Sequence, residues 1–302
     1  MPMIQTRDGT SLYVKTLGQG RPVVLIHGWP LSADSWDPQM MALADAGFRA
    51  IAYDRRGFGR SDQPPGGYDY KTFSDDLADV MEACEAMENA ALVGFSMGGG
   101  EIARYMSRHG GKGVTQAVLV SSIVPYMLQT DDNPDGVPDD VFQQMTQGMK
   151  KDFRHFFKKF FQDFYGVGWV SQSVSDEELH WAWMTTMRAG QYATLQSAAA
   201  FAYTDFRPDL PNFRVPTLII HGTGDKTVPI DATAREVVKK VPQAELVEYH
   251  GEPHAVFATQ RDRLSQDLVN FLGRPGAQKT VRTQPQAVTD AVTADAISAD
   301  PV

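Results

Sequence analysis

The amino-acid sequence predicts an α/β protein with a mostly parallel eight-stranded sheet, helices on both faces and an inserted helical cap. Short apolar runs rich in valine, isoleucine and leucine alternate with longer amphipathic stretches, as is typical of parallel strands joined by helices. Several runs are apolar at successive positions, as expected for strands buried on both faces. Residues 124–207 contain no such run but hold about half of the aromatic residues, which predicts a helical insertion.

The strands follow one another in a simple order. The first two flank Asp8-Gly9, a strong hairpin signal, so the sheet is expected to begin with an antiparallel pair. Amphipathic stretches predict helices near Asp75 to Met87 and over Met97 to His109. The expected strands are Ile4 to Arg7, Ser11 to Thr16, Pro22 to His27, Phe48 to Tyr53, Ala90 to Phe95, Gln116 to Ser121, Pro216 to His221 and Ala244 to Tyr249.

The insertion contains one helix with a distinctive pattern. Phenylalanines recur at helical spacing from Phe153 to Phe164, and lysine and arginine side chains occupy the other side. Three interpretations remain open: the stripe packs on the main domain partly over a pocket, it is purely core, or it contacts a membrane surface. An acidic loop rich in proline and glycine, Thr130 to Asp140, precedes this helix.

These patterns divide the chain into three parts. Residues 1–123 and 208–272 are expected to form the α/β core, and residues 124–207 the helical cap. Residues 273–302 contain no aromatic side chain and as many basic as acidic ones. A segment of this composition cannot bury a core, so the tail is expected to be disordered.

The amino-acid composition narrows the classes of function that this protein can have. The chain carries 28 lysine and arginine residues against 37 acidic ones, a net charge of −9, which disfavours nucleic acid and anionic membranes as partners. The single cysteine, Cys84, excludes an intramolecular disulfide and a multi-cysteine metal site. The segment Met1 to Arg7 lacks the apolar core of a signal peptide. We therefore expect a soluble cytoplasmic protein that acts on a small molecule, with assembly into a homo-oligomer left open.

The motif Gly94-Phe95-Ser96-Met97-Gly98 is the strongest indication of chemistry. It closes a buried strand and opens a helix, which is the setting of a serine nucleophile on a sharp strand-to-helix turn. Glycines on either side let the strand and helix approach closely. The alternative, a glycine-rich turn with an incidental serine, is less favoured in this setting.

A serine hydroxyl needs a base, and the base needs an acid that orients it. In open α/β sheets, sites form at the carboxyl ends of the strands, so the loops after Ile220 and Tyr249 are the places to search. The first loop offers Asp225 and the second offers His254. The order Ser96, Asp225, His254 matches one of the known serine hydrolase arrangements.

Other candidates for the acid and the base are less favoured. His27 and His221 end strands and precede glycine, where a histidine more often braces a loop, and His250 lies too close to its strand. No H-E-x-x-H motif occurs, so no metal site is expected. The remaining alternatives are His109, His155 and His180 for the base, and Asp205, Asp209 and Asp231 for the acid.

Acyl transfer also requires donors for the developing oxyanion. The backbone N–H of Met97, at a helix N-terminus, is one candidate. The loop after the third strand reads His27-Gly28-Trp29-Pro30, and the N–H of Trp29 is the second candidate because proline has none. The Trp29 ring would then form a wall of the pocket.

Two further features are assigned structural roles. The stretch Gly57 to Asp62 resembles a dinucleotide-binding motif but lacks its last glycine, so no nucleotide cofactor is expected and Asp54 and Arg55 are expected to tether loops. Cys84 is expected to be a small core residue rather than a nucleophile.

Taken together, these motifs resemble the α/β-hydrolase family, and within it the small bacterial aryl esterases that are also called cofactor-free haloperoxidases or non-haem chloroperoxidases. The resemblance covers about Ile4 to Leu272, whereas the acidic loop and the tail are longer than the family pattern. The motifs on which the resemblance rests are HGWP at 27–30, YDRRGFGRSD at 53–62, GFSMGGGE at 94–101, VPTLIIHGTGD at 215–225 and GEPH at 251–254.

The resemblance implies a cofactor-independent serine hydrolase that cleaves small aryl or acyl esters. Peroxide and a short carboxylic acid such as acetate are implied as further reactants, because family members form peracids that oxidise halide. Ser96 argues against epoxide hydrolases and haloalkane dehalogenases of this fold, which use aspartate at that position. The less favoured alternatives are a lactamase, an aminopeptidase with Glu177 and Glu178 binding the amine, and a non-catalytic ligand-binding protein.

Overall fold

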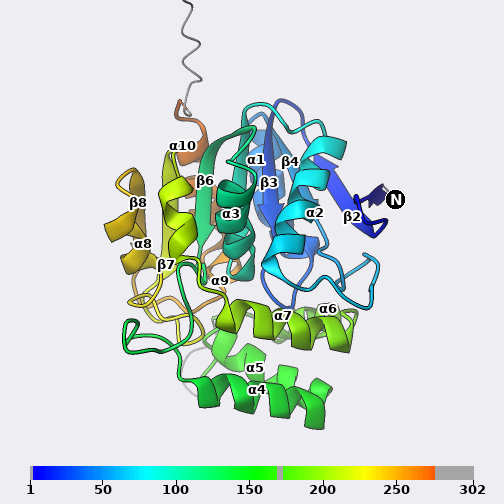
Figure 1. Cartoon of the computed structure of the whole chain (residues 1–302), viewed down its shortest axis with the longest axis vertical. Helices are drawn as coiled ribbons and strands as arrows, with labels where there is room; N and C mark the ends of the chain where they lie inside the picture. The colour runs from blue at the N-terminus through cyan, green and yellow to red at the C-terminus, as the bar shows by residue number, and fades with distance from the viewer. Residues whose placement is uncertain (1–2, 169–172, 276–302) are drawn as a thin grey trace, which may run out of the picture.

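The computed structural model describes residues 3–168 and 173–275 and has an eight-stranded sheet with the order β1-β2-β4-β3-β5-β6-β7-β8 (Figure 1). The pairs β1–β2 and β2–β4 are antiparallel, and every other neighbouring pair is parallel. The predicted α/β architecture is therefore confirmed. The strands are β1 Met3–Gln5, β2 Ser11–Leu17, β3 Arg21–Ile26, β4 Phe48–Tyr53, β5 Ala90–Phe95, β6 Val114–Val120, β7 Thr217–Gly222 and β8 Ala244–Tyr249.

The sheet begins with the hairpin that Asp8-Gly9 predicts. Gly9 has a φ of 86°, a conformation that favours glycine, and Met3 and Gln5 pair with Tyr13 and Ser11. The first strand begins one residue earlier than expected and ends at Gln5, two residues before the expected end. Its end is set by Thr6, whose N–H donates to the carbonyl of Thr10 at 2.9 Å and so belongs to the turn.

Helices cover both faces of the sheet (Figure 1). On one face α1, Asp37–Asp45, packs against α10, Arg261–Leu272, and on the other α2, Tyr70–Ala83, packs against α3, Met97–Arg108. The central strands are buried on both faces, so their continuous apolar runs form the core between the two helical layers. The remaining elements of the core are η1 Ala33–Trp36, η2 Arg207–Asn212, α8 Ala234–Lys240 and α9 Val256–Thr259.

Four helices lie together at one end of the sheet (Figure 1). They fall within residues 124–207, where the described part of the chain adds no strand to the sheet. The boundaries of this stretch as a separate cap stay a prediction. The four helices are α4 Asp139–Lys151, α5 Phe153–Phe164, α6 Asp176–Thr186 and α7 Gln191–Tyr203.

Helix α5 turns its phenylalanine stripe inward. Phe157, Phe161 and Phe164 are buried, whereas the lysine side chains at 158 and 159 are exposed. The stripe contacts the main domain, because the rings of Phe157 and Trp29 lie 5.2 Å apart. This arrangement agrees with the first of the three interpretations, a helix packed on the main domain. Among the described helices, none has the length and apolar character needed to cross a bilayer.

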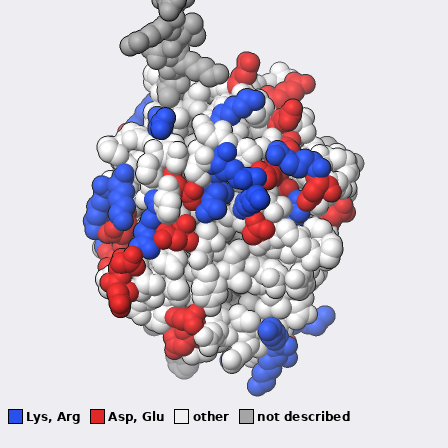
Figure 2. Space-filling view, in the orientation of Figure 1, with Lys and Arg blue, Asp and Glu red and all other residues white. Residues whose placement is uncertain are grey.

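Charged side chains are distributed unevenly over the surface. Figure 2 shows blue and red side chains intermixed over the sheet and its covering helices, and a largely uncharged band over the four-helix module. A blue group lies at the lower edge of the module. The tail that is predicted to be disordered comprises residues 273–302. Of these, residues 276–302 lie outside the described part of the chain.

Candidate active site

Ser96 lies on the sharp turn between β5 and α3. Its backbone has φ 52° and ψ −116°, a strained conformation for a residue with a side chain. The flanking glycines are needed for steric reasons, because a Cβ on Gly94 would lie 2.6 Å from the carbonyl oxygen of Gly98. A Cβ on Gly98 would lie 2.5 Å from the carbonyl oxygen of Ile26 in β3. A side chain at either position would therefore push helix α3 away from the neighbouring strand.

The structure brings Ser96, His254 and Asp225 together at the carboxyl ends of three strands. The Oγ of Ser96 lies 3.0 Å from Nε2 of His254. The Nδ1 of His254 lies 2.6 Å from Oδ2 of Asp225. Asp225 follows β7 and His254 follows β8, so both come from the loops in which the sequence places them. All three side chains are buried, which strengthens their electrostatic interactions.

The Asp225 carboxylate is ionised, and both of its oxygens accept hydrogen bonds. Its Oδ1 accepts hydrogen bonds from the backbone N–H groups of Thr227, at 2.9 Å, and Val228, at 2.8 Å. Burial alone would raise the pKa of Asp225, but the charge of His254 and the hydrogen bonds from His221 and His254 outweigh it. The pKa of Asp225 is therefore held well below its ordinary value. An ionised acid in this place can fix the imidazole tautomer and stabilise an imidazolium.

The His254 ring is held between two phenylalanines. Its centroid lies 5.0 Å from that of Phe95, from β5, and 4.8 Å from that of Phe164, from α5. The N–H of Ala255 donates to the carbonyl of Phe164 at 3.1 Å. The helical module therefore supports the loop that carries His254.

Trp29, in the loop after β3, and Met97, the first residue of α3, are the expected oxyanion donors and lie on either side of the serine turn. Trp29 follows β3, which pairs with β5, and the intervening Gly28 is so close that its Cβ would lie 3.1 Å from the Cβ of Ser96. The Trp29 ring lines the cavity as expected, and its Nε1 donates to the carbonyl of Thr194 at 3.0 Å. The role of the two N–H groups stays a prediction.

A buried ionic cluster lies behind the loop that carries Trp29. The side chain of Arg55 donates to the carbonyl of His27 at 2.7 Å and pairs with Glu101 of α3. Glu101 also accepts a 2.5 Å hydrogen bond from Tyr53. Burial, and then the charge of Arg55, hold the pKa of His27 well below its ordinary value, so His27 is neutral. This cluster ties the helix after Ser96 to the loop after β3.

The expectation that Asp54 and Arg55 tether loops agrees with these contacts. Asp54 accepts hydrogen bonds from the backbone N–H of Ala33, at 2.8 Å, and from the N–H and side chain of Arg60. The sequence did not reveal the participation of Glu101. Its place at the end of the GFSMGGGE motif, five residues after Ser96, marked the position but indicated no partner.

A cavity of about 210 Å³ opens beside Ser96 and His254. Its wall is mostly apolar, and the two charged side chains along it, Asp163 of α5 and Lys226, were not foreseen from the sequence. The apolar side chains that line it are Trp29, Ile123, Met127, Val137, Val141, Phe142, Met145, Phe160, Phe164, Phe201 and Val228.

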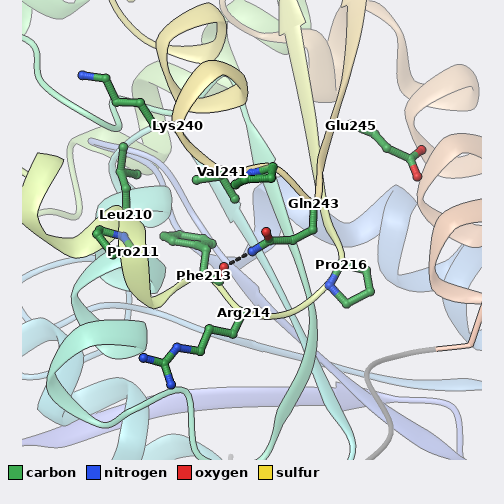
Figure 3. A pocket seen from close by; sticks show the side chains of 10 residues that line it. Leu210, Pro211, Phe213, Arg214, Pro216, Lys240, Val241, Gln243 and Glu245 are labelled. Carbon is green, nitrogen blue, oxygen red and sulfur yellow. Dashed lines mark hydrogen bonds between the residues drawn. The ribbon is translucent and has the colours of Figure 1, made fainter.

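A second depression, of about 640 Å³, lies away from this site (Figure 3). It is lined mostly by residues that precede β7 and β8, including Phe213, Pro216 and Gln243, so it lies at the opposite ends of the strands from Ser96. Figure 3 shows the side chain of Gln243 donating to the carbonyl of Phe213 at its floor. None of the expected site residues lines it.

The alternative acids and bases lie elsewhere. His250 is exposed, and His109 is bonded to Asp75 at the surface. Asp209 is held by Arg104 and Ser107. His221 differs from the others because it lies beside Asp225. Within residues 3–168 and 173–275, no group of three or more His, Cys, Asp or Glu side chains is arranged to hold a metal ion.

The fold and the arrangement around Ser96 define a class of protein. Residues 21–260 match the family model of the α/β-hydrolase fold, and the chain belongs to that family. Within it, the chain belongs to the group of non-haem haloperoxidases and related esterases. It is 42% identical to the non-heme chloroperoxidase CPO-A1 of Kitasatospora aureofaciens, over 91% of this chain and 100% of that protein.

Two further relatives represent both activities named in the group. The bifunctional esterase/perhydrolase DCH of Acinetobacter calcoaceticus is 37% identical over 90% of this chain and 99% of its own length. The crystal structure of a bromoperoxidase from Bacillus anthracis matches with a TM-score of 0.87 and 39% identity, over 90% of this chain and 99% of that one.

Proposed function

We propose that this protein is a serine esterase that cleaves small carboxylic esters through an acyl-enzyme, and that it also transfers the acyl group to hydrogen peroxide. The observation that carries the proposal is the unbroken series of contacts from Ser96 through His254 to Asp225. All three side chains are buried, and their sequence of contacts is the one that a nucleophile, a base and an acid require.

In the first half-reaction the Ser96 hydroxyl attacks the ester carbonyl carbon while Nε2 of His254 takes its proton. The N–H groups of Trp29 and Met97 stabilise the oxyanion, each contributing about 3 kcal/mol in the transition state. The tetrahedral intermediate then expels the alcohol, which receives the proton from His254. The Ser96 ester that remains is the acyl-enzyme.

In the second half-reaction His254 takes a proton from water, and the resulting hydroxide attacks the acyl carbon. The Ser96–acyl bond breaks, Ser96 regains its proton from His254, and a carboxylic acid leaves. Asp225 accepts the Nδ1 hydrogen of His254 throughout and stabilises the imidazolium that forms twice per cycle.

Cavity size and polarity support small substrates. About 210 Å³ is less than the roughly 300–1,000 Å³ of sites for drug-sized ligands, and the wall is mostly apolar. We assign residues 124–207 to a cap, because α5 contributes Phe160, Asp163 and Phe164 to this wall. Short acyl groups with a small aryl or alkyl alcohol are therefore the proposed substrates.

Peroxide in place of water would give a peracid. Its terminal oxygen attacks the same acyl carbon, and His254 takes its proton. The peracid, once released, can transfer oxygen to bromide or chloride, which yields hypohalite and the carboxylic acid. The names of the relatives support this second activity. The alternative is that peracid formation, rather than ester hydrolysis, is the physiological reaction.

Esters of graded acyl length, assayed with and without hydrogen peroxide and bromide, test the proposal. We expect hydrolysis to be fastest with short acyl groups and to lead to bromide oxidation when peroxide and a carboxylic acid are present. Ser96→Ala should lower kcat by about six orders of magnitude, because the three residues act as a unit. Ester hydrolysis without peracid formation would retain the esterase and refute the perhydrolase.

A further inference from the structure

A second histidine lies against the proposed catalytic acid. His221 is the next-to-last residue of β7 and its side chain is fully buried. Its Nε2 lies 3.0 Å from the carbonyl oxygen of Val228 and 3.2 Å from Oδ2 of Asp225. The same Oδ2 is the atom that accepts from His254 at 2.6 Å. Two imidazoles therefore face one carboxylate oxygen.

The contacts fix where His221 carries its proton. Both atoms near Nε2, a carbonyl oxygen and a carboxylate oxygen, are acceptors, so Nε2 must be the protonated nitrogen. Its N–H donates to Val228 and presents its positive end to Asp225. The other nitrogen, Nδ1, is buried and has no hydrogen-bond partner among the described residues, so a proton there would be an unsatisfied buried donor.

The unpartnered Nδ1 also argues against a role in packing alone. A buried polar atom without a partner costs stability, which an apolar side chain of similar size would avoid. Among the described residues, polar contacts are made only by the Nε2 side of the ring, and those contacts reach Val228 and Asp225. Val228 in turn donates its own N–H to Oδ1 of Asp225 at 2.8 Å. His221 therefore closes a ring of contacts around the acid.

We propose that His221 is a positioning residue that holds the Asp225 carboxylate with Oδ2 directed at Nδ1 of His254 and shares that oxygen with it. The proposal rests on the proposed function. By sharing Oδ2, the N–H of His221 offsets part of the negative charge that His254 experiences. It also takes the place of water, which a buried carboxylate would otherwise require.

This arrangement determines the direction of a pH effect. The titratable groups that face Asp225 are His254, from the loop after β8, and His221, from β7. Lys226 and Asp163 line the cavity beside His254 and stay the same in every variant. Without the His221 N–H, the full charge of Asp225 would act on His254 and favour its protonated form. The acid limb of the kcat/KM profile should then move to higher pH.

Three substitutions at one position test the proposal. His221→Leu removes the N–H, His221→Gln places an amide N–H near the position of Nε2, and His221→Asn is too short to reach it. We expect Leu and Asn to lower kcat on a short aryl acetate by about 10- to 100-fold, as for a hydrogen bond to a charged group. KM should change little, and the acid limb should rise by about 0.5 to 1 pH unit. Gln should restore both.

A matched control separates stability from positioning. Gln116→Leu also replaces a buried polar side chain on a neighbouring strand, but its hydrogen bond goes to the carbonyl of Phe271, away from Asp225. We expect it to lower stability without moving the pH profile.

The outcomes distinguish this proposal from the proposed function. The His221 proposal is overturned if the Leu variant retains wild-type kcat, if Gln and Asn lose activity equally, or if the acid limb does not move. If the His221→Leu variant fails to fold, the comparison of His221→Gln with His221→Asn still tests whether the N–H near Nε2 is needed. Activity that survives Ser96→Ala would instead refute the proposed function, whatever His221 does.

Discussion

Gly98→Ala tests the link between the serine turn and the oxyanion loop. A Cβ on Gly98 would lie 2.5 Å from the carbonyl oxygen of Ile26, whereas ordinary contacts begin at 3.4 Å. Helix α3 and strand β3 would therefore have to separate by the difference, about 0.9 Å. Ser96 immediately precedes α3, and the loop with Trp29 begins just after Ile26, so this separation would widen the site.

The expected losses follow from that separation. A displacement of about 1 Å in a catalytic arrangement costs roughly 100-fold in rate, so kcat/KM for an aryl acetate should fall by about that factor. Stability should change less, because alanine favours a helix by about 1 kcal/mol while overpacking costs about 1–3 kcal/mol. Unfolding in urea and steady-state kinetics measure the two effects separately.

A matched control is available at Gly66. A Cβ there would meet nothing within 4 Å, so Gly66→Ala should leave both stability and kcat/KM near wild type. If Gly98→Ala retained the wild-type kcat/KM, the close approach of α3 to β3 would not control the site, and the reasoning would be refuted.

Two further substitutions test the surroundings of the site. Glu101→Gln should cost about 3–5 kcal/mol of unfolding free energy, because it leaves Arg55 as an unpaired buried charge. The control is Glu236→Gln, in an exposed pair with Lys239, which should change the unfolding free energy by at most about 0.5 kcal/mol. Equal effects of the two substitutions in urea unfolding would contradict the account. Phe164→Ala should lower kcat by about 10-fold, because the imidazole loses its orienting contact. The control in the same helix is Phe156→Ala, which should retain kcat.

The sequence predicted the sheet well because its central strands are apolar on both faces. Strands β4, β5 and β8 have the expected ends, whereas β1 ends two residues earlier than expected because Thr6 enters the turn. These features depend on local periodicity and turn chemistry, which are read directly from adjacent residues.

The site was predictable only in part. Ser96 is marked by local glycines, and Asp225 and His254 by their places after strands. The contact of Glu101 is different, because it depends on how elements distant in the chain meet. The contact of His221 with Asp225 spans only four residues, but it depends on the fold of the loop after β7. Arg55 and Glu101 are 46 residues apart, and no local pattern pairs them. His221 was assigned to loop bracing, and only the distance from its Nε2 to Asp225 indicates the further role.

The central claim is that Ser96 forms a covalent acyl-enzyme with help from His254. An aryl phosphonate ester tests it most directly, because the same attack releases the phenol and leaves a stable phosphonyl group on the nucleophile. We predict one equivalent of phenol per protein, parallel loss of esterase activity, and the label on the peptide that contains Ser96. Ser96→Ala should take up none. A label on another residue that accompanies the loss of activity, or labelling of the Ser96→Ala variant at the wild-type rate, would contradict the claim.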